Sequence, residues 1–129
     1  METAEEFIRR YLQMKADLRG AMSKAYVPFY EKYFTNDWNN YRSDVDAKRR
    51  DEEFVTIEMG DQTARAITIE PFKNMENRRR YILCVVDGQW KISGKESECF
   101  NCHGSGKYGD LKCTICDGVG WKDYLRSTT

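Results

Sequence analysis

The N-terminal part of the chain has the apolar pattern of an amphipathic helix. Thr3 and Glu6 are spaced as in a capping box, in which each side chain satisfies a backbone N–H that the first helical turn leaves unpaired. Apolar residues then recur mostly every three or four positions, which predicts a helix that ends near Tyr26. Val27 precedes Pro28, and proline suits a first helical turn, so a second, shorter helix is predicted to follow. The apolar stripe of the first helix consists of Phe7, Ile8, Tyr11, Leu12, Met14, Leu18, Met22 and Ala25.

After residue 53 the apolar and polar residues follow the pattern of β-strands. Residues 36–53 are polar and are predicted to form a loop or a marginal helix. Residues 54–59 and 64–70 favour strands on either side of a Gly60-Asp61 turn, with Ile67 and Ile69 on one face of the second strand. These two segments therefore predict a hairpin.

A second hairpin is predicted after a break over residues 71–77. Residues 81–86 are apolar on both faces, as expected for a central strand. Asp87-Gly88 is a strong two-residue turn signal, and residues 89–92 continue as a strand. Helices followed by antiparallel strands predict an α+β fold in which the N-terminal helices pack on the sheet.

Composition and charge narrow the class of protein. The chain has 129 residues, 40% of them apolar, which is enough for one core and points to a single main domain. Lys plus Arg and Asp plus Glu number 21 each, so no overall charge attracts nucleic acid or an anionic membrane. The acidic N-terminus and the lack of a long apolar run argue against a targeting peptide or a membrane span, and we expect a cytoplasmic protein.

Four of the five cysteines form two closely spaced pairs near the C-terminus. Residues 99–106 and 113–120 repeat one pattern, Cys-x-x-Cys-x-Gly-x-Gly, at a 14-residue period. This change of composition divides the chain into a main domain at 1–95 and a cysteine-rich tail at 96–129. The paired cysteines are Cys99, Cys102, Cys113 and Cys116.

The spacing of these cysteines predicts one structural zinc ion per chain. Two thiolates three positions apart reach one ion from a tight turn, and two such turns complete a tetrahedral four-sulfur site. The glycines allow backbone conformations that direct N–H groups at sulfur. A closed site of this kind stabilises the tail and leaves no position for a substrate. A redox dithiol pair or another metal is the alternative. The glycines concerned are Gly104, Gly106, Gly118 and Gly120.

The repeat resembles the cysteine-rich repeats of DnaJ-type chaperones. The likeness covers residues 99–120, with two repeats where that family has four, and there is no J-domain signature. It implies the same four cysteine ligands and a rubredoxin-like knuckle at each pair, and it implies no chaperone activity.

No catalytic residues are predicted. His103 is the only histidine and directly follows a proposed ligand, so the common histidine-based mechanisms have no base to recruit. Cys84 lies in an apolar strand, where a thiol behaves as a small hydrophobe. The basic runs 48–50 and 78–80 lie in predicted loops and are interpreted as solvated surface.

The order of the elements and the sequence Asp87-Gly-Gln-Trp90-Lys-Ile92 resemble the nuclear-transport-factor-2-like superfamily. This resemblance implies that residues 3–95 form a cone-shaped α+β domain with a curved antiparallel sheet. The superfamily includes isomerases, dehydratases and cyclases that use the cone cavity, as well as non-enzymatic binding proteins such as bacterial toxin-immunity proteins. Aromatic residues that could line such a cavity, or form ordinary core, are Tyr26, Phe29, Tyr30, Tyr33, Trp38 and Trp90.

The functional hypothesis is a non-catalytic, zinc-stabilised protein-binding protein, with an immunity-type inhibitor of a bacterial toxin as its concrete form. Lys107, Tyr108 and Asp110 are the candidate partner-binding residues on the zinc-fixed loop. The alternative is a small-molecule enzyme or ligand-binding protein that uses the cone cavity.

Nucleic acid is not the expected partner, because lysines in the tail are offset by acidic residues. The sequence leaves the oligomeric state open. The tail is expected to pack on the main domain through Phe100, Tyr108, Ile115 and Trp121.

Overall fold

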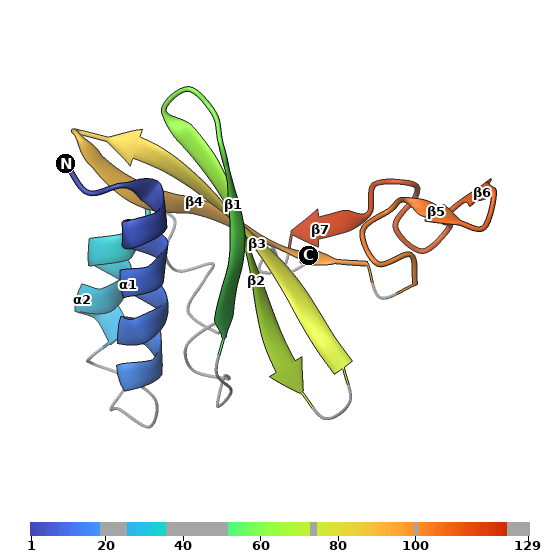
Figure 1. The fold of residues 1–129 in the computed structure, drawn as a ribbon, viewed down its shortest axis with the longest axis horizontal. Coiled ribbons are helices and arrows are strands. Elements are labelled where there is room, and N and C mark those ends of the chain that lie inside the picture. Colours follow the sequence, from blue (N-terminus) through green and yellow to red (C-terminus); the bar gives the residue numbers. More distant parts are fainter. Residues whose placement is uncertain (19–25, 36–51, 73–74, 100, 124–129) are drawn as a thin grey trace.

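Figure 1 shows a computed structural model of the chain, which describes residues 1–18, 26–35, 52–72, 75–99 and 101–123. Two helices come first and strands follow, so the predicted α+β class is confirmed. None of the described helices has the length and apolar character needed to cross a membrane. In chain order the elements are α1 (Ala4–Asp17), α2 (Tyr26–Tyr33), β1 (Glu53–Met59), β2 (Thr63–Phe72), β3 (Met75–Val86), β4 (Gln89–Glu98), β5 (Lys107–Tyr108), β6 (Leu111–Lys112) and β7 (Trp121–Asp123).

The capping box begins α1 as predicted. The Glu6 backbone N–H donates to Thr3 Oγ1 at 3.1 Å, and the Thr3 backbone N–H donates to Glu6 Oε1 at 2.8 Å. The helix ends at Asp17 with Leu18 as its C-cap, earlier than the apolar stripe predicts. Residues 19–25, which carry the rest of that stripe, lie outside the described part of the chain. Helix α2 begins at Tyr26, which places Pro28 in its first turn, where its missing N–H costs no hydrogen bond.

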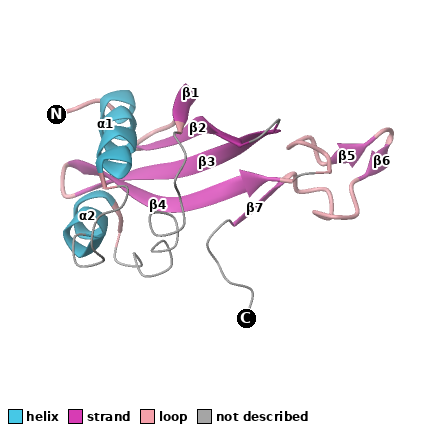
Figure 2. Ribbon diagram, turned by 90° about the horizontal axis from the view of Figure 1, so that it is seen from below, coloured by secondary structure: helices cyan, strands magenta, loops and turns pink. Residues whose placement is uncertain are grey.

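Five antiparallel strands form the main sheet, in the order β1-β2-β3-β4-β7 (Figure 2). Asp87 and Gly88 turn β3 into β4 with φ values of 52° and 78°, as the two left-handed residues of a tight hairpin require. The break predicted over residues 71–77 is wrong at most of these positions, because Pro71 pairs with Glu76 and Phe72 with Met75. Residues 73–74 lie outside the described part of the chain.

Both helices cover one face of this sheet. On that face lie Ala64 and Ala66 of β2, with Tyr81 and Leu83 of β3 opposite them. The ring of Tyr11 is fully buried and lies 5.4–5.6 Å from four other aromatic rings, in an arrangement in which each pair stabilises the core by about 0.5–1.5 kcal/mol. Those rings belong to Phe29, Tyr33, Phe34 and Tyr81.

The cysteine-rich tail extends from the end of the sheet that lies away from the helices (Figure 1). Strand β4 runs through the boundary predicted at residue 95 and ends at Glu98, and β7 returns to pair with it, so the two units share a strand. The β5–β6 hairpin lies farther out.

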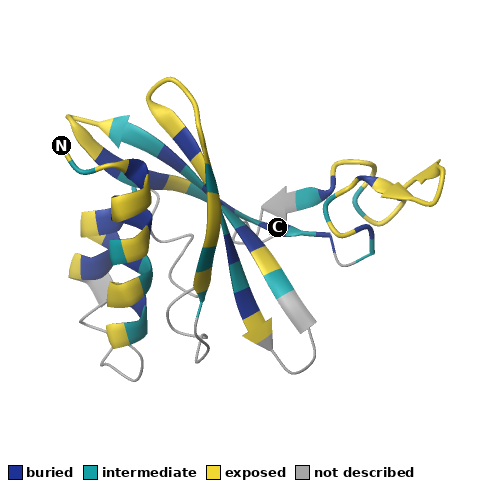
Figure 3. Ribbon diagram, viewed as in Figure 1, coloured by how far each residue is buried: buried dark blue, intermediate teal, exposed yellow. Residues whose placement is uncertain are grey.

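The prediction that Tyr108 and Ile115 pack on the main domain is wrong. Their side chains are 66% and 58% exposed, because the cysteines fill the interior of the tail and direct the hairpin and second knuckle outward (Figure 3). Trp121 does reach the main sheet, since the Arg80 guanidinium lies 4.5 Å from its ring. Phe100 lies outside the described residues.

Candidate metal centre

The fold brings together the sulfur atoms of Cys99, Cys102, Cys113 and Cys116. All four lie within 4.8 Å of one another, and two pairs from opposite knuckles are 3.8 and 3.6 Å apart. Disulfide-bonded sulfurs would be about 2.05 Å apart. Sulfurs that surround one ion tetrahedrally at about 2.3 Å are about 3.8 Å apart, so the spacing fits a shared metal ion. The predicted grouping of the four cysteines is therefore confirmed, and the donor set is suited to a structural metal.

The 14-residue sequence repeat is also a repeat of backbone conformation. In each knuckle the second cysteine is followed by two left-handed residues, and a third left-handed residue comes two positions later. The Cys102 carbonyl accepts from Ser105 N–H, and the Cys116 carbonyl accepts from Val119 N–H, both at 3.2 Å. The left-handed residues are His103, Gly104 and Gly106 in the first knuckle and Asp117, Gly118 and Gly120 in the second.

Two glycines let the knuckles approach each other closely. A Cβ at Gly106 would lie 2.4 Å from the Gly118 carbonyl oxygen, and one at Gly120 would lie 2.5 Å from the Gly104 carbonyl oxygen. Both distances are far below the van der Waals contact distance, so a side chain at either position would push the knuckles apart. Two backbone hydrogen bonds also join the knuckles. The N–H of Cys113 donates to the carbonyl of Gly106 in the first knuckle, and the N–H of Cys99 donates to the carbonyl of Gly120 in the second.

N–H groups surround the sulfurs and favour their charged form. Gly106 N–H donates to Cys102 Sγ at 3.3 Å, and Gly120 N–H donates to Cys116 Sγ at 3.1 Å. The Asn101 side-chain amide donates to Cys113 Sγ at 3.3 Å and lowers the pKa of that thiol to about 6. Burial raises the pKa of Cys116 to about 11. The lowered pKa of Cys113 favours its thiolate, the form that binds a metal.

His103 lies beside this centre but takes no part in it. Its ring is 76% exposed, and its Nδ1 lies 3.8 Å from the Glu98 carboxylate. Within the described part of the chain, the candidate ligand cluster consists of the four cysteines. With four protein ligands the site has no open coordination position, which is the arrangement of structural rather than catalytic metal sites.

The other residues predicted to be functional fall into two groups. Phe29, Tyr30 and Tyr33 are buried and pack against one another in the core, whereas Trp90 is buried beside a pocket at the start of α1. The side chain of Tyr26 and all of Trp38 lie outside the described part. The candidate partner-binding residues Lys107, Tyr108 and Asp110 are all exposed at the β5–β6 hairpin.

A buried polar network under α1 was not predicted from the sequence. The Glu52 carboxylate accepts from Lys15 Nζ at 2.6 Å and from the Tyr81 hydroxyl at 2.8 Å, and it also accepts from the Thr68 hydroxyl. The side chains of Lys15 and Glu52 are only 7% and 3% exposed. The available signal was Lys15 itself, which lies four residues after Tyr11 on the apolar stripe of α1.

The same sheet face carries more buried charge toward the cysteine-rich end. Glu70 and Lys95 are fully buried, and Arg79 is nearly so. Arg79 Nη2 lies 3.8 Å from Glu70 Oε1, and Lys95 Nζ lies 5.0 Å from the centre of the Tyr81 ring. Arg79 therefore departs from the solvated surface expected for the basic run at 78–80, because its position in β3 turns it to the covered face.

Comparisons with protein-family models, with curated proteins and with solved structures give no match for this chain.

Replacing Gly120 with alanine tests the contact between the knuckles. Gly120→Ala should weaken metal binding about tenfold or more relative to Gly109→Ala, because overpacking costs about 1–3 kcal/mol. Gly109 is the matched control, since it also has a positive φ but its added Cβ would meet nothing within 4 Å. Metal affinity is measured by competition with a chelator. Equal affinities in the two variants would show that the close approach is not needed.

Proposed function

We propose that this chain is a non-catalytic protein-binding protein whose C-terminal module is held in shape by one zinc ion. The four-thiolate donor set and the sulfur spacing support zinc, which accepts tetrahedral sulfur coordination without geometric strain. The closed coordination supports a structural role. The resemblance of the knuckles to DnaJ-type repeats points to the same metal.

The observation that carries the protein-binding role is the set of apolar side chains that the module exposes. Tyr108 and Leu111 are paired across the β5–β6 hairpin, so their side chains lie on the same face. Ile115 and Val119 lie on the second knuckle. Among the described residues, the buried cluster of this module consists of cysteines, whereas four large apolar side chains are exposed to water. A partner that covers these side chains would explain their exposure. Their exposed fractions are 66% for Tyr108, 75% for Leu111, 58% for Ile115 and 67% for Val119.

The position of the module supports recognition of a protein surface. It extends away from the helices, and the knuckles fix the hairpin so that little ordering is lost on binding. Lys107 and Asp110 flank the apolar pair and supply charged contacts at its rim. The form of this role that we favour is an immunity-type inhibitor that covers the active site of a toxin, as the nuclear-transport-factor-2-like resemblance of residues 3–95 suggests.

The zinc assignment is tested with cysteine variants. Purified wild-type protein should contain about one zinc per chain, and Cys99→Ser and Cys113→Ser should lose both the zinc and thermal stability, because the module folds around its metal. Cys84→Ser is the control, since Cys84 lies outside the cluster, and it should keep its zinc. Metal content is measured together with thermal unfolding. Wild-type protein that binds no zinc and has four freely reactive tail thiols would contradict the assignment.

The binding role is tested with aspartate substitutions on two exposed apolar residues. Leu111→Asp should weaken binding of the partner about tenfold or more if Leu111 lies in the contact. Met59→Asp is the control, because Met59 is 57% exposed but lies at the β1–β2 turn. The partner is identified by crosslinking to the zinc-loaded chain in extracts of its source cell, and affinity is then measured with the purified protein.

Two outcomes would contradict the binding role. One is that no protein crosslinks specifically to the wild-type chain. The other is that the purified partner binds Leu111→Asp as tightly as it binds Met59→Asp. If the partner is a toxin, a stoichiometric amount of the chain should abolish its activity, and a toxin that stays fully active in the complex would contradict the immunity form.

A second candidate function, a cone-cavity enzyme or ligand-binding protein, is favoured by the network around Glu52. A groove of about 410 Å³ between α1 and β1 is lined by Glu52 together with Arg9, Leu12 and Phe54. The Tyr81 hydroxyl and the Glu52 carboxylate form a hydrogen-bonded acid–base pair, and Lys15 balances the carboxylate charge. Such a pair could move a proton to or from a small molecule, as an isomerase, dehydratase or cyclase requires.

This candidate is tested with a double variant that removes the ion pair without leaving a charge unpaired. Glu52→Gln alone should destabilise the fold by about 3–5 kcal/mol, because Lys15 is then buried without its partner, and Lys15→Met/Glu52→Gln should recover much of that loss. A panel of small hydroxy and keto compounds is screened by thermal shift. A compound that stabilises the wild type but not the double variant would support the candidate, and a panel in which no compound stabilises the wild type would count against it.

A further inference from the structure

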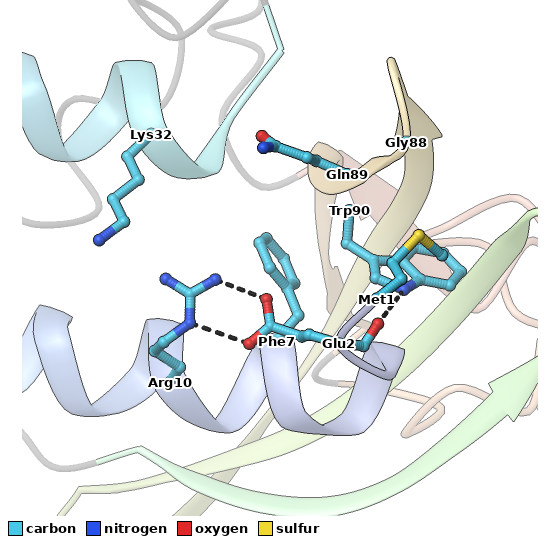
Figure 4. A pocket seen from close by; sticks show the side chains of 8 residues that line it. All are labelled: Met1, Glu2, Phe7, Arg10, Lys32, Gly88, Gln89 and Trp90. Atoms are coloured by element: carbon cyan, nitrogen blue, oxygen red, sulfur yellow. Dashed lines mark hydrogen bonds and ion pairs between the residues drawn. The ribbon is translucent and has the colours of Figure 1, made fainter.

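A pocket of about 400 Å³ lies between the start of α1, the end of α2 and the β3–β4 turn (Figure 4). It is at the opposite end of the molecule from the cysteine module, and it shares no lining residue with the groove at Glu52. Two buried aromatic residues, Phe7 and Trp90, form its apolar wall. This volume and this combination of aromatic surface with a few polar groups are typical of small-molecule sites. Its polar side chains belong to Glu2, Arg10, Lys32 and Gln89.

Arg10 already binds a carboxylate in this pocket. Its Nε and Nη2 donate to the two carboxylate oxygens of Glu2 at 3.0 and 2.6 Å, which is the forked geometry that guanidinium groups prefer. Nη1 donates to the Tyr33 hydroxyl at 2.9 Å, and this third contact fixes the plane of the group. The hydrogen bonds to Glu2 raise the pKa of Arg10. The guanidinium is thus set to receive a carboxylate.

Lys32 adds a second positive charge to the same space. Its side chain extends from α2 toward Arg10 across the pocket (Figure 4). Among the residues that the structure describes, no carboxylate forms an ion pair with Lys32, and its ammonium lies 5.5 Å from the Tyr33 ring. The pocket therefore has two cations and one carboxylate, and it favours a further anionic group.

Glu2 can leave Arg10 without disturbing the fold around it. Its backbone carbonyl accepts a hydrogen bond from Trp90 Nε1 at 3.1 Å, and the adjacent Thr3 is held by the capping box. The Glu2 side chain is 35% exposed. Rotation of this side chain into water would free the guanidinium while the backbone stays in place.

We propose that this pocket binds a small organic carboxylate with a flat apolar body, and that Glu2 occupies the position of the ligand carboxylate in the free protein. The ligand carboxylate replaces Glu2 on Arg10 and takes a second contact from Lys32. The apolar body lies against Phe7 and Trp90. The site is independent of the cysteine module, so it would give the chain a small-molecule function in addition to partner binding.

The proposal is tested by calorimetric titration of the zinc-loaded chain with 1-naphthoate, and with 1-naphthalenemethanol as the neutral analogue. The acid should bind at least about tenfold more tightly than the alcohol, because only the acid makes charge-assisted hydrogen bonds to Arg10. Glu2→Gln should tighten naphthoate binding about fivefold by removing the internal competitor, and Lys32→Gln should weaken it by a similar factor.

Lys107→Gln is the matched control for Lys32→Gln, because it removes one exposed positive charge at the far end of the molecule. It should leave naphthoate affinity unchanged. The proposal is wrong if the acid and the alcohol bind equally, if Lys32→Gln and Lys107→Gln have the same effect, or if neither wild type nor Glu2→Gln binds naphthoate at concentrations up to about 10 mM. Partner binding by the cysteine module does not enter this test, so the two proposals can fail separately.

Discussion

Four cysteine sulfurs that lie within 4.8 Å of one another are the constraint around which the C-terminal module, residues 99–120, is arranged. Among the described residues of this module, the buried cluster consists of cysteines, and Tyr108, Leu111, Ile115 and Val119 are exposed. Burial of these large apolar side chains therefore does not stabilise the module. We propose that the knuckles depend on a metal, on N–H groups directed at sulfur, and on the glycine contacts between Gly106 and Gly118 and between Gly120 and Gly104. Because Cys99 follows β4 and Gly120 precedes β7, the same centre brings the last strand onto the main sheet.

The features that were predicted from the sequence are those with short-range causes. The capping box of Thr3 and Glu6, the Asp87-Gly88 turn and the paired cysteines each depend on residues close together in the chain, and the structure contains all three. The missed features depend on residues distant in the sequence. The buried ion pair joins Lys15 to Glu52, and the end of α1 at Leu18 is not marked by any change in its apolar stripe.

The alternation of apolar and polar residues in β2 also failed to predict which face of the strand is buried. The apolar residues Ile67 and Ile69 suggest one face, yet Thr68 and Glu70 lie on the face that the helices and the polar network cover. Small residues at Ala64 and Ala66 make room for the aromatic rings. Of the polar residues that follow them, Thr68 donates to Glu52, which precedes β1, and Glu70 pairs with Arg79 of β3. Tertiary partners therefore overrode the local preference, as is common for strands. Tyr108 and Ile115 were expected to pack on the main domain, but both are exposed on the module, and only their apolar character, not their distance from the main sheet, could be seen in the sequence.

The candidate functional sites thus lie at opposite ends of the molecule. An aromatic core joins the helices to the sheet, a pocket with two cationic side chains lies at one end, and the four-cysteine module with exposed apolar residues lies at the other. The central claim is that one zinc ion holds the module through four sulfur ligands. X-ray absorption at the zinc edge of the purified protein tests it most directly. The account predicts a single shell of four sulfurs at about 2.3 Å. A shell that contains nitrogen or oxygen, or zinc-free protein with disulfides in the tail, would contradict it.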